Sequence, residues 1–541
     1  MATYRFSPSE RPAVPGAPFT PRHTGARRAA YAAVGVVLAS TATFPNALVT
    51  VNVGTIAGSL GVYVAQANIL PAIYVAMNAS ANLTLVKARA QFGIPALTHW
   101  LLIVYAAVAL LQLATPGLEA GMLIRAVSGV VAALLTTLGT YYMSQAFPAE
   151  QRPMAIAIAL GLLQLGTPLA RQLPVELLAQ NGWRVLHLVE LATALGVLAL
   201  IALVPLPPVV CTRAFETSDV VTIGLAVPGM LLLCGVIGTG RFLWWTDTPV
   251  LGLALAASIP LFVLAWLLEI RRTRPLVQFA WLGTAAILRF AVVALVVRFA
   301  LAEQTYGSVG LLTSGGLTND QLRLLFAVVA VAMVAGTAAA ALTLSQQSPP
   351  WQIMAAVLII ATGAWLDAHS NNLTRPEQLY VSQALIGFGT TLFIGPALLT
   401  GLVQMLARGP EYFVSIIVLF SITQNVGGLL GSAVLGTYQT IQAKSHTAAL
   451  YEHLLAADPN VTERIALGAA TVRGALVDAT QQSAQGVSQL AQATAREANV
   501  LAYNDVFALV TIIALIGALY VGWPAIVSAV RRRQPPAPRP A

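Results

Sequence analysis

Long hydrophobic runs restrict what this chain can fold into more than any other feature. Each run holds about twenty mostly apolar residues, enough for a helix to cross roughly 30 Å of hydrocarbon. About fourteen such runs begin near Tyr31, Val62, Ala96, Gly121, Pro153, Leu186, Asp219, Thr248, Leu282, Leu322, Trp351, Leu379, Glu411 and Asn504. Because a spanning segment must satisfy its own backbone hydrogen bonds, this pattern predicts an all-α polytopic membrane protein.

Composition excludes several classes of function. Of 541 residues, 57% are hydrophobic and 9% are charged, whereas soluble proteins have about 25% charged residues. The net charge of +9 does not indicate nucleic-acid binding, because the basic residues lie in short segments between apolar runs. Cys211 and Cys234 indicate neither a disulfide framework nor a metal site. The chain has no phosphate-binding Gly-Lys-Ser/Thr loop and no His-Glu-x-x-His helix, so we expect no enzyme activity, cofactor or metal.

The lysine and arginine distribution predicts the topology. Residues 1–28 have no apolar segment that could act as a signal peptide, so they are expected to form a disordered basic tail. With this tail inside, an even number of spans places both termini in the cytoplasm, together with the clustered basic residues. These are Lys87, Arg89, Arg152, Arg213, Arg271, Arg272, Arg274, Arg408, Arg531, Arg532 and Arg533.

Ionisable side chains within the spans are candidate functional residues, because they are costly in a membrane and usually face a cavity or a partner. Arg125, Arg171, His187 and Glu190 are predicted at similar depth. His187 and Glu190 are three residues apart and share a helix face. Glu190 is the candidate proton site, with Arg125 and His187 beside it. The alternatives are a static ion pair of Glu190 with Arg125 or Arg171, or a hydrated Glu190 near the surface.

The ninth span carries two arginines. Arg298 is expected to extend to the external interface, and Glu303 to lie just beyond the span. Arg289 is too deep to reach water easily, so it is expected to face a cavity, where it could bind an anionic group of a substrate. The alternative is that Arg289 pairs with a backbone carbonyl or a neighbouring helix.

A long segment at residues 439–502 connects the last two spans. It is rich in alanine and glutamine, and apolar residues recur at Ala484, Val487, Leu490 and Ala491. This spacing predicts an amphipathic helix or a helical hairpin outside the membrane. The segment could form a cap on its own chain or a docking surface for a partner protein.

The stretch LIRAVSGVVAALLTTLGTYYMSQAFPAEQRPMAIAI has an arginine, a glycine four residues later, and then a Phe-Pro and a charged loop ending in arginine. It resembles the fourth span and following loop of the fourteen-helix drug:proton antiporters of the major facilitator superfamily, and NGWRVLHLVELATALG resembles the start of their sixth span. LGTPLA resembles the antiporter motif of span five, SITQNVGGLLGSAV resembles span thirteen, and the long loop is similar to that of EmrB/QacA-type exporters. The matching positions are Arg125, Gly129, Phe147, Pro148, Arg152, Gly166, Pro168, Gly427 and Gly428.

The chain departs from this family at two motifs. In FPNALVTVNVG, Pro45 or Asn46 stands where the family has the span-one carboxylate that carries the proton. VKARAQFGIPA retains Lys87, Arg89, Phe92 and Gly93, but Ala90 replaces the aspartate of the gating salt bridge, which therefore cannot form. These losses leave Glu190 as the better acid for coupling, at a position where the family usually has an asparagine.

The resemblance implies a major facilitator fold with two six-helix bundles and two inserted helices. Small residues and prolines in spans five, twelve and thirteen would let such bundles approach closely and rock. Asn46, Thr50, Arg171 and Arg289 are expected around a central cavity. The expected segments are a tail at 1–28, bundles at 29–206 and 281–526, inserted helices at 207–280 and a cytoplasmic tail at 527–541.

The function implied by the resemblance is proton-coupled efflux across a bacterial inner membrane. Expected substrates are small amphipathic compounds such as drugs, aromatic acids or toxic metabolites. Related exporters with this loop often work with a periplasmic adaptor and an outer-membrane channel, which are the expected partners beside the lipid bilayer. Two alternatives are a dedicated exporter of an endogenous lipid, siderophore or pigment, and a membrane scaffold or sensor that no longer transports.

Overall fold

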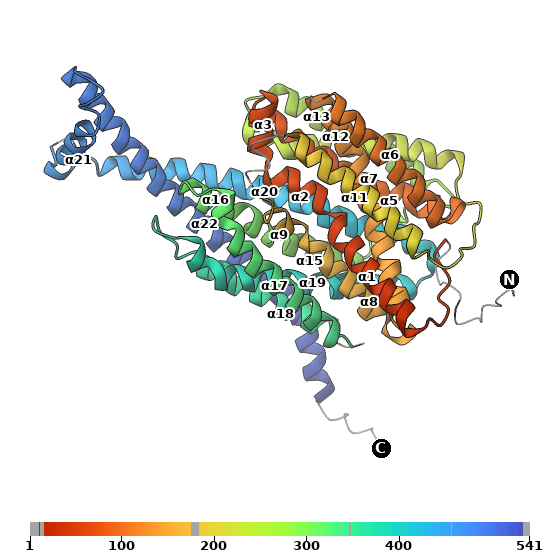
Figure 1. Cartoon of the computed structure of the whole chain (residues 1–541). Coiled ribbons are helices and arrows are strands. Elements are labelled where there is room, and N and C mark those ends of the chain that lie inside the picture. The colour runs from red at the N-terminus through yellow and green to blue at the C-terminus, as the bar shows by residue number, and fades with distance from the viewer. Residues whose placement is uncertain are drawn as a thin grey trace.

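The computed structural model describes residues 10, 16–115, 117–174, 183–345, 348–455 and 457–533, without the side chains of residues 183, 410 and 524–533. These residues form helices joined by short segments (Figure 1). Fourteen helices in this part of the chain are long and apolar enough to cross a membrane, which confirms the predicted all-α fold. Residues 1–9 and 11–15 of the predicted N-terminal tail and the side chains of Arg531, Arg532 and Arg533 lie outside the described residues, whereas residues 25–28 already belong to the first helix and not to a disordered tail.

The first bundle contains the first six spans. Span one is broken at Thr43, where α1 ends and Pro45 occupies the first turn of the next helix. The helices of this bundle are α1 (Gly25–Ala42), α2 (Phe44–Val51), α3 (Val53–Leu60), α4 (Val64–Ala67), α5 (Ile69–Phe92), α6 (Ile94–Ala114), α7 (Leu118–Ala146), α8 (Arg152–Leu162), α9 (Gly166–Ala170) and α11 (Trp183–Leu203).

The second bundle follows two inserted helices, α12 (Thr217–Leu243) and α13 (Pro249–Ile270). Helix α12 packs on α13, and it also packs on one helix of each bundle, α5 and α20. The elements of the second bundle are α14 (Phe279–Leu282), α15 (Ala285–Ala300), the π-helical turn η4 (Glu303–Gly307), α16 (Ser308–Ser314), α17 (Arg323–Leu342), α18 (Pro349–Asp367), α19 (Tyr380–Leu406), α20 (Phe413–Glu452) and α22 (Ala479–Arg533).

The structure explains why glycine occupies two positions, 129 and 93, in the motifs shared with the antiporter family. Gly129 lies where α7 meets α5, and a β-carbon there would be 2.6 Å from the carbonyl oxygen of Tyr74. Gly93 has φ +78° and separates α5 from α6. Glycine is suited to both positions because it has no β-carbon and readily adopts positive φ.

One end of the bundles, which we call the basic face, carries Lys87, Arg152, Asp219 and Arg272, and ion pairs join Lys87 and Arg272 to Asp219. Lys87 Nζ lies 2.6 Å from Asp219 Oδ2, and Arg272 Nη2 lies 2.8 Å from Asp219 Oδ1. Partial burial alone would lower the pKa of Arg272, but hydrogen bonds to Glu269, Asp219 and Glu216 raise it. This network joins the end of α5 to both inserted helices.

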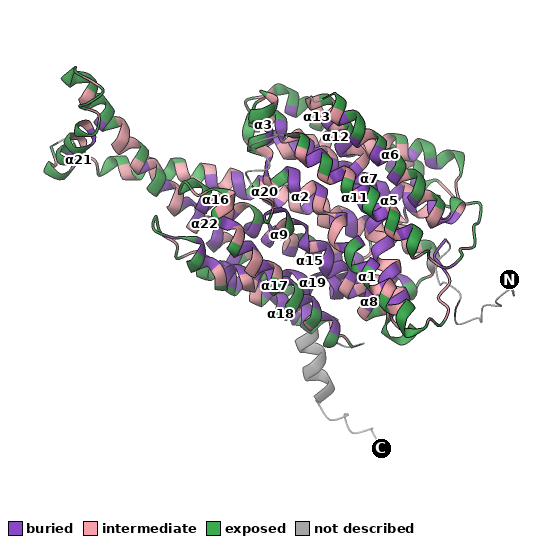
Figure 2. Ribbon diagram, viewed as in Figure 1, coloured by how far each residue is buried: buried purple, intermediate pink, exposed green. Residues whose placement is uncertain are grey.

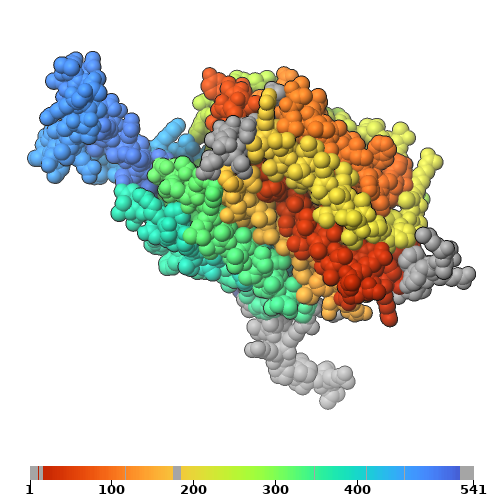
Figure 3. All heavy atoms as spheres, in the orientation of Figure 1, coloured from red at the N-terminus to blue at the C-terminus, as the bar shows by residue number. Residues whose placement is uncertain are grey.

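The opposite end carries a projecting arm formed by residues 439–502. Helices α20 and α22 continue past the other helices, and α21 (Pro459–Ala470) packs on α22 (Figures 1 and 3). We call this end the arm face. The arm extends away from the bundles and its residues are mostly exposed (Figure 2), so the structure does not show a cap folded on its own chain.

The helices of the arm differ from the prediction in two respects. Helix α22 begins at Ala479 and runs without a break through the fourteenth span, which was expected to begin near Asn504. The predicted apolar stripe does not form a buried face, because Ala484 and Val487 are exposed while Ala498 and Ala502 are fully buried. The contacts of α22 with α20 and α18 determine which side is buried, and spacing alone does not reveal them.

Candidate functional site

A cavity of about 700 Å³ lies between the two bundles. Its walls come from α2, α5, α7 and α8 on one side and from α15, α19 and α20 on the other. It reaches from Thr50 and Thr305 at its inner end to Arg152 and Thr20 at the basic face. A volume of this size is typical of sites for small organic molecules.

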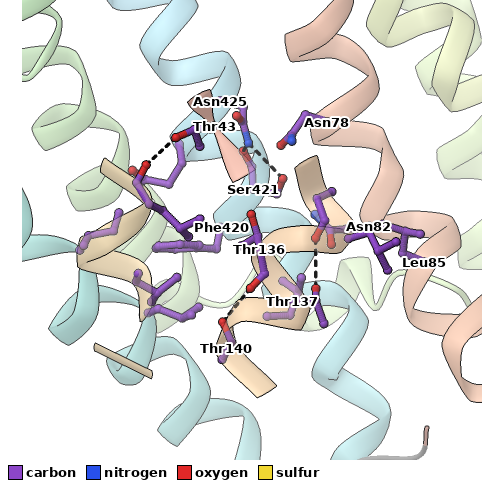
Figure 4. Close-up of a pocket in the computed structure, with 18 of the residues that line it drawn as sticks. Thr43, Asn78, Asn82, Leu85, Thr136, Thr137, Thr140, Phe420, Ser421 and Asn425 are labelled. Carbon is purple, nitrogen blue, oxygen red and sulfur yellow. Dashed lines mark hydrogen bonds between the residues drawn. The ribbon is translucent and has the colours of Figure 1, made fainter. Parts of the chain in front are cut away.

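Most polar side chains in the wall are uncharged. Thr136 and Thr140 on α7 donate to the carbonyl oxygens of Ala132 and Thr136, each at 2.9 Å. Because threonines in membrane helices commonly bond their own helix in this way, their hydroxyl oxygens can still accept hydrogen bonds from a ligand. The side chains that converge on the cavity in Figure 4 include Asn78, Asn82, Thr136, Thr137, Thr140, Ser421 and Asn425.

All the charged side chains among the described residues that line the cavity are arginines: Arg89, Arg152 and Arg298. Arg298 lies nearest the inner end, where its Nε donates to the carbonyl oxygen of Gln424 at 2.8 Å. A β-carbon at Gly428 would lie 2.8 Å from this Nε, so the glycine makes room for the guanidinium against α20. The cavity therefore has a positive electrostatic character.

Arg89 joins the two bundles near the basic face. Its Nη1 donates to Tyr141 Oη at 2.6 Å on α7, and its guanidinium stacks 4.9 Å from the ring centre of Phe413 at the start of α20. The side chain is buried, yet Nε and Nη2 have no hydrogen-bond partner in the part of the chain that the structure describes. Arg89 can therefore still donate to an acceptor that enters the cavity.

The segment of residues 16–20 crosses the mouth of the cavity. Arg152 Nη2 donates to Thr20 Oγ1 at 2.6 Å, and Gln145 Nε2 donates to the carbonyl oxygen of Phe19 at 2.9 Å. On the other side, the Phe19 N–H donates to the carbonyl oxygen of Pro208 at 3.1 Å. A molecule entering from the basic face must pass this segment.

The structure brings Arg125, His187 and Glu190 together, but away from the cavity. Arg125 Nη2 forms an ion pair with Glu190 Oε1, and His187 Nδ1 lies 3.4 Å from Glu190 Oε2. All three side chains are fully buried, and none is among the described residues that line the cavity. This geometry favours the ion-pair alternative, and a role of Glu190 in proton transfer stays a prediction.

Arg171 lies apart from these three residues and outside the cavity wall. Its Nη1 donates to Asn319 Oδ1 at 2.7 Å, and its guanidinium lies 4.9 Å from the ring centre of Phe326. Gln172 Nε2 also donates to the carbonyl oxygen of Arg323 at 3.0 Å. Arg171 thus connects the end of α9 to the start of the tenth span, and it holds the bundles together at the arm face.

Neither arginine of the ninth span lies where we expected it. Arg289 lies in the second turn of α15 and is exposed, so it does not face the cavity. Arg298 lines the cavity and does not extend to the interface. The reason is that α20 provides a groove at Gly427 and Gly428, which a sequence does not reveal.

Asn46 and Thr50 both line the cavity from α2. The Thr50 hydroxyl donates to the carbonyl oxygen of Asn46 at 2.9 Å, while Asn46 Oδ1 is buried and has no partner among the described residues.

Gly166 lies beside the break in span one, where a β-carbon would be 3.1 Å from the carbonyl carbon of Thr43, and Pro168 is buried in α9. No group of acidic, histidine or cysteine side chains in the described part of the chain could hold a metal ion.

No protein-family model and no curated protein matches the chain in sequence. Solved structures do match it in fold. A bacterial homologue of the human drug peptide transporters PepT1 and PepT2 has a TM-score of 0.54 at 13% identity, over 94% of this chain and 100% of that one. The proton:xylose symporter XylE has a TM-score of 0.52 at 13% identity, over 91% and 95% of the two chains. The human organic anion transporter MFSD10 has a TM-score of 0.51 at 13% identity, over 91% and 100%. The chain therefore has the major facilitator fold, with two helices inserted between its two bundles of six.

Proposed function

We propose that this protein exports small amphipathic organic anions across a membrane by alternating access. The observation that carries the proposal is the cavity between the bundles, whose charged side chains among the described residues are all arginines. Arg89 and Arg298 offer donors to a carboxylate or sulfonate. Ile94, Leu134 and Phe420 in the same wall offer apolar surface to the rest of such a molecule.

The contacts between the bundles support an alternating mechanism. The cavity reaches the basic face, while Arg171 and Gln172 hold the bundles together at the arm face. Rocking of one bundle against the other would break these contacts and open the cavity at the arm face. We propose that the basic face is cytoplasmic, in line with the positive-inside rule, and that the membrane is a bacterial inner membrane. In this orientation the cavity is ready to load from the cytoplasm, as an exporter requires.

The charge of the cavity narrows the range of substrates that the sequence implied. Among drugs, aromatic acids and toxic metabolites, acids fit three arginines best, because a cation would be repelled from a low-dielectric cavity of the same sign. One protein of similar fold is a human organic anion transporter, which agrees with this choice. We further propose that a proton gradient drives export, and that the arm docks a periplasmic adaptor connected to an outer-membrane channel.

Flux into or out of vesicles tests the proposal. The purified chain, reconstituted in liposomes, is supplied with naphthalenesulfonate, a permanently charged aromatic anion, or with N-methylquinolinium, a cation of similar shape. We expect saturable flux of the anion above the level of protein-free liposomes and no such flux of the cation. Equal transport of both ions would refute the charge preference, and transport of neither would refute a carrier of this class and favour a scaffold.

A further inference from the structure

Two acids are buried side by side in the second bundle. Glu303 belongs to η4 and Asp367 ends α18; their exposed fractions are 0% and 1%. Glu303 was expected just beyond the ninth span, but it lies inside the span Ala285–Ser314. Gln383 on α19 lies between the two acids. Its Nε2 donates to Asp367 Oδ2 at 2.6 Å and to Glu303 Oε1 at 3.2 Å.

Ionisable groups on the surrounding elements are engaged with other partners. Arg298 donates to the carbonyl oxygen of Gln424, and Arg375 donates to the carbonyl oxygen of Thr374 at 3.1 Å. On the other side of η4, Arg241 lies 4.8 Å from the ring centre of Tyr306. Tyr503 lies with its ring centre 6.2 Å from that of Tyr306, His446 pairs with Asp505, and His369 bonds the carbonyl oxygen of Trp365. Glu377 is exposed. In the described part of the chain, no cation is paired with either acid.

A buried pair of acids without a cation is stable only when it is partly protonated. Two adjacent carboxylates cannot both be ionised at low cost, so such pairs share a proton. Both carboxyl groups accept from the same amide nitrogen, Gln383 Nε2, so they lie beside each other. Independently, Asp367 Oδ1 is buried and has no partner among the described residues, so it lacks the donor that a protonated Glu303 would supply.

We propose that Glu303, Asp367 and Gln383 form a proton-binding site that holds one proton in the conformation described here. The amide of Gln383 presents N–H groups to both acids, an arrangement that suits a carboxylic acid and its carboxylate. A metal ion would require oxygen atoms in place of these N–H groups. Aspartate and glutamate on neighbouring membrane helices are the usual components of proton relays.

The turn η4 connects this site to the cavity. Glu303 points toward α18 and α19, whereas Thr305, two residues later, lines the cavity. Tyr306 from the same turn reaches Gln439 on α20, with 3.4 Å between Oη and Oε1. Short π-helical turns are often found at functional sites. Loss of the proton would leave two negative charges side by side, and their repulsion would move a turn that forms part of the cavity wall.

Coupling of this proton to export depends on the proposed function, but proton binding itself does not. Infrared difference spectra of the full chain in lipid nanodiscs, titrated from acid to alkaline pH, report the carbonyl band of protonated carboxyl groups. We expect one band that disappears at alkaline pH. It should be missing in Glu303→Gln and in Asp367→Asn, and present in the matched control Glu377→Gln. A wild-type protein without this band would overturn the proposal, whether or not the variants fold.

Further outcomes distinguish a proton site from a sodium site, and failure of the proton site from failure of the proposed function. A thermal stability that rises with Na⁺ but not with K⁺ in the wild type, and not in Glu303→Gln, would overturn the proposal in favour of a sodium site. Infrared evidence for the proton without naphthalenesulfonate flux would contradict the proposed function and support the proton site. Flux without the infrared band would contradict the site and leave the proposed function intact.

Discussion

Arg298 lines the inner end of the cavity, and under the proposed function we expect it to select anions there. A hydrogen bond to a charged group contributes about 1.5–3 kcal/mol. Arg298 is partly exposed, so we expect a value near the lower limit. Arg298→Gln should therefore raise KM for naphthalenesulfonate about tenfold, with little change in Vmax. The measurement is initial flux into proteoliposomes over a range of concentrations.

Arg289→Gln is the matched control for Arg298. It removes the same charge from the same helix at an exposed position outside the cavity. We expect wild-type kinetics. Equal losses in both variants would show that overall charge, and not the cavity, selects the anion.

We expect the buried ion pair of Arg125 and Glu190 to stabilise the first bundle. Glu190→Gln would leave the fully buried Arg125 without its carboxylate, which we expect to cost about 3–5 kcal/mol in the free energy of unfolding. The double variant Arg125→Met with Glu190→Leu should recover most of that loss. Thermal unfolding in detergent checks both expectations. An unchanged Tm in Glu190→Gln, combined with loss of gradient-driven export, would instead support the prediction that Glu190 carries the proton.

Residue types indicated parts of the site, and tertiary contacts decided the rest. Asn46 and Thr50 were expected at the cavity and line it, because they are polar residues within an apolar span. Depth along a span could not distinguish Arg289 from Arg298, since the groove at Gly428 comes from another helix. The pair of Glu303 and Asp367 could not be predicted because each acid lies near the end of a different hydrophobic run.

Close contacts between helices depend on single glycines. A methyl group at Gly129 would approach the Tyr74 carbonyl oxygen to 2.6 Å, and a backbone atom cannot yield as a side chain can. We expect Gly129→Ala to destabilise the protein by about 1–3 kcal/mol. The control is Gly196→Ala in α11, where a β-carbon would meet no atom within 4 Å, and its Tm should be unchanged or slightly higher. Equal Tm values for both variants would contradict this account of α5 and α7.

The arm is an element whose removal should leave the transport mechanism intact. Helix α21 packs on α22, and the arm projects from the bundles. Replacement of residues 457–476 by a short Gly-Ser linker should therefore leave naphthalenesulfonate flux in liposomes at the wild-type level. Export from cells should fall if the arm docks an adaptor. Loss of flux in liposomes would show that the arm belongs to the transport mechanism itself.

Hydropathy predicted the spans well and the arm poorly, for the same physical reason. Apolar runs of membrane length identify the helices that span the membrane, and the predicted starts lie close to the observed ones for most of the spans. Residues 479–502 are too polar for such a run, yet they continue α22 as one helix. Hydropathy therefore indicated where the span begins and not where the helix begins.

Alternating access requires the two bundles to separate at the arm face during each transport cycle. Arg171 and Asn319 belong to different bundles, and 2.7 Å separates Arg171 Nη1 from Asn319 Oδ1. Cysteines at these two positions, in a chain with Cys211→Ser and Cys234→Ser, can be joined by a short, reducible bifunctional maleimide. Proteins with only one of the two cysteines, treated with the same reagent, are the controls.

Naphthalenesulfonate flux through this cross-linked protein in liposomes tests alternating access directly. We predict that cross-linking abolishes the flux, that reduction of the linker restores it, and that the single-cysteine controls remain active. Undiminished flux through the fully cross-linked protein would contradict alternating access between these bundles.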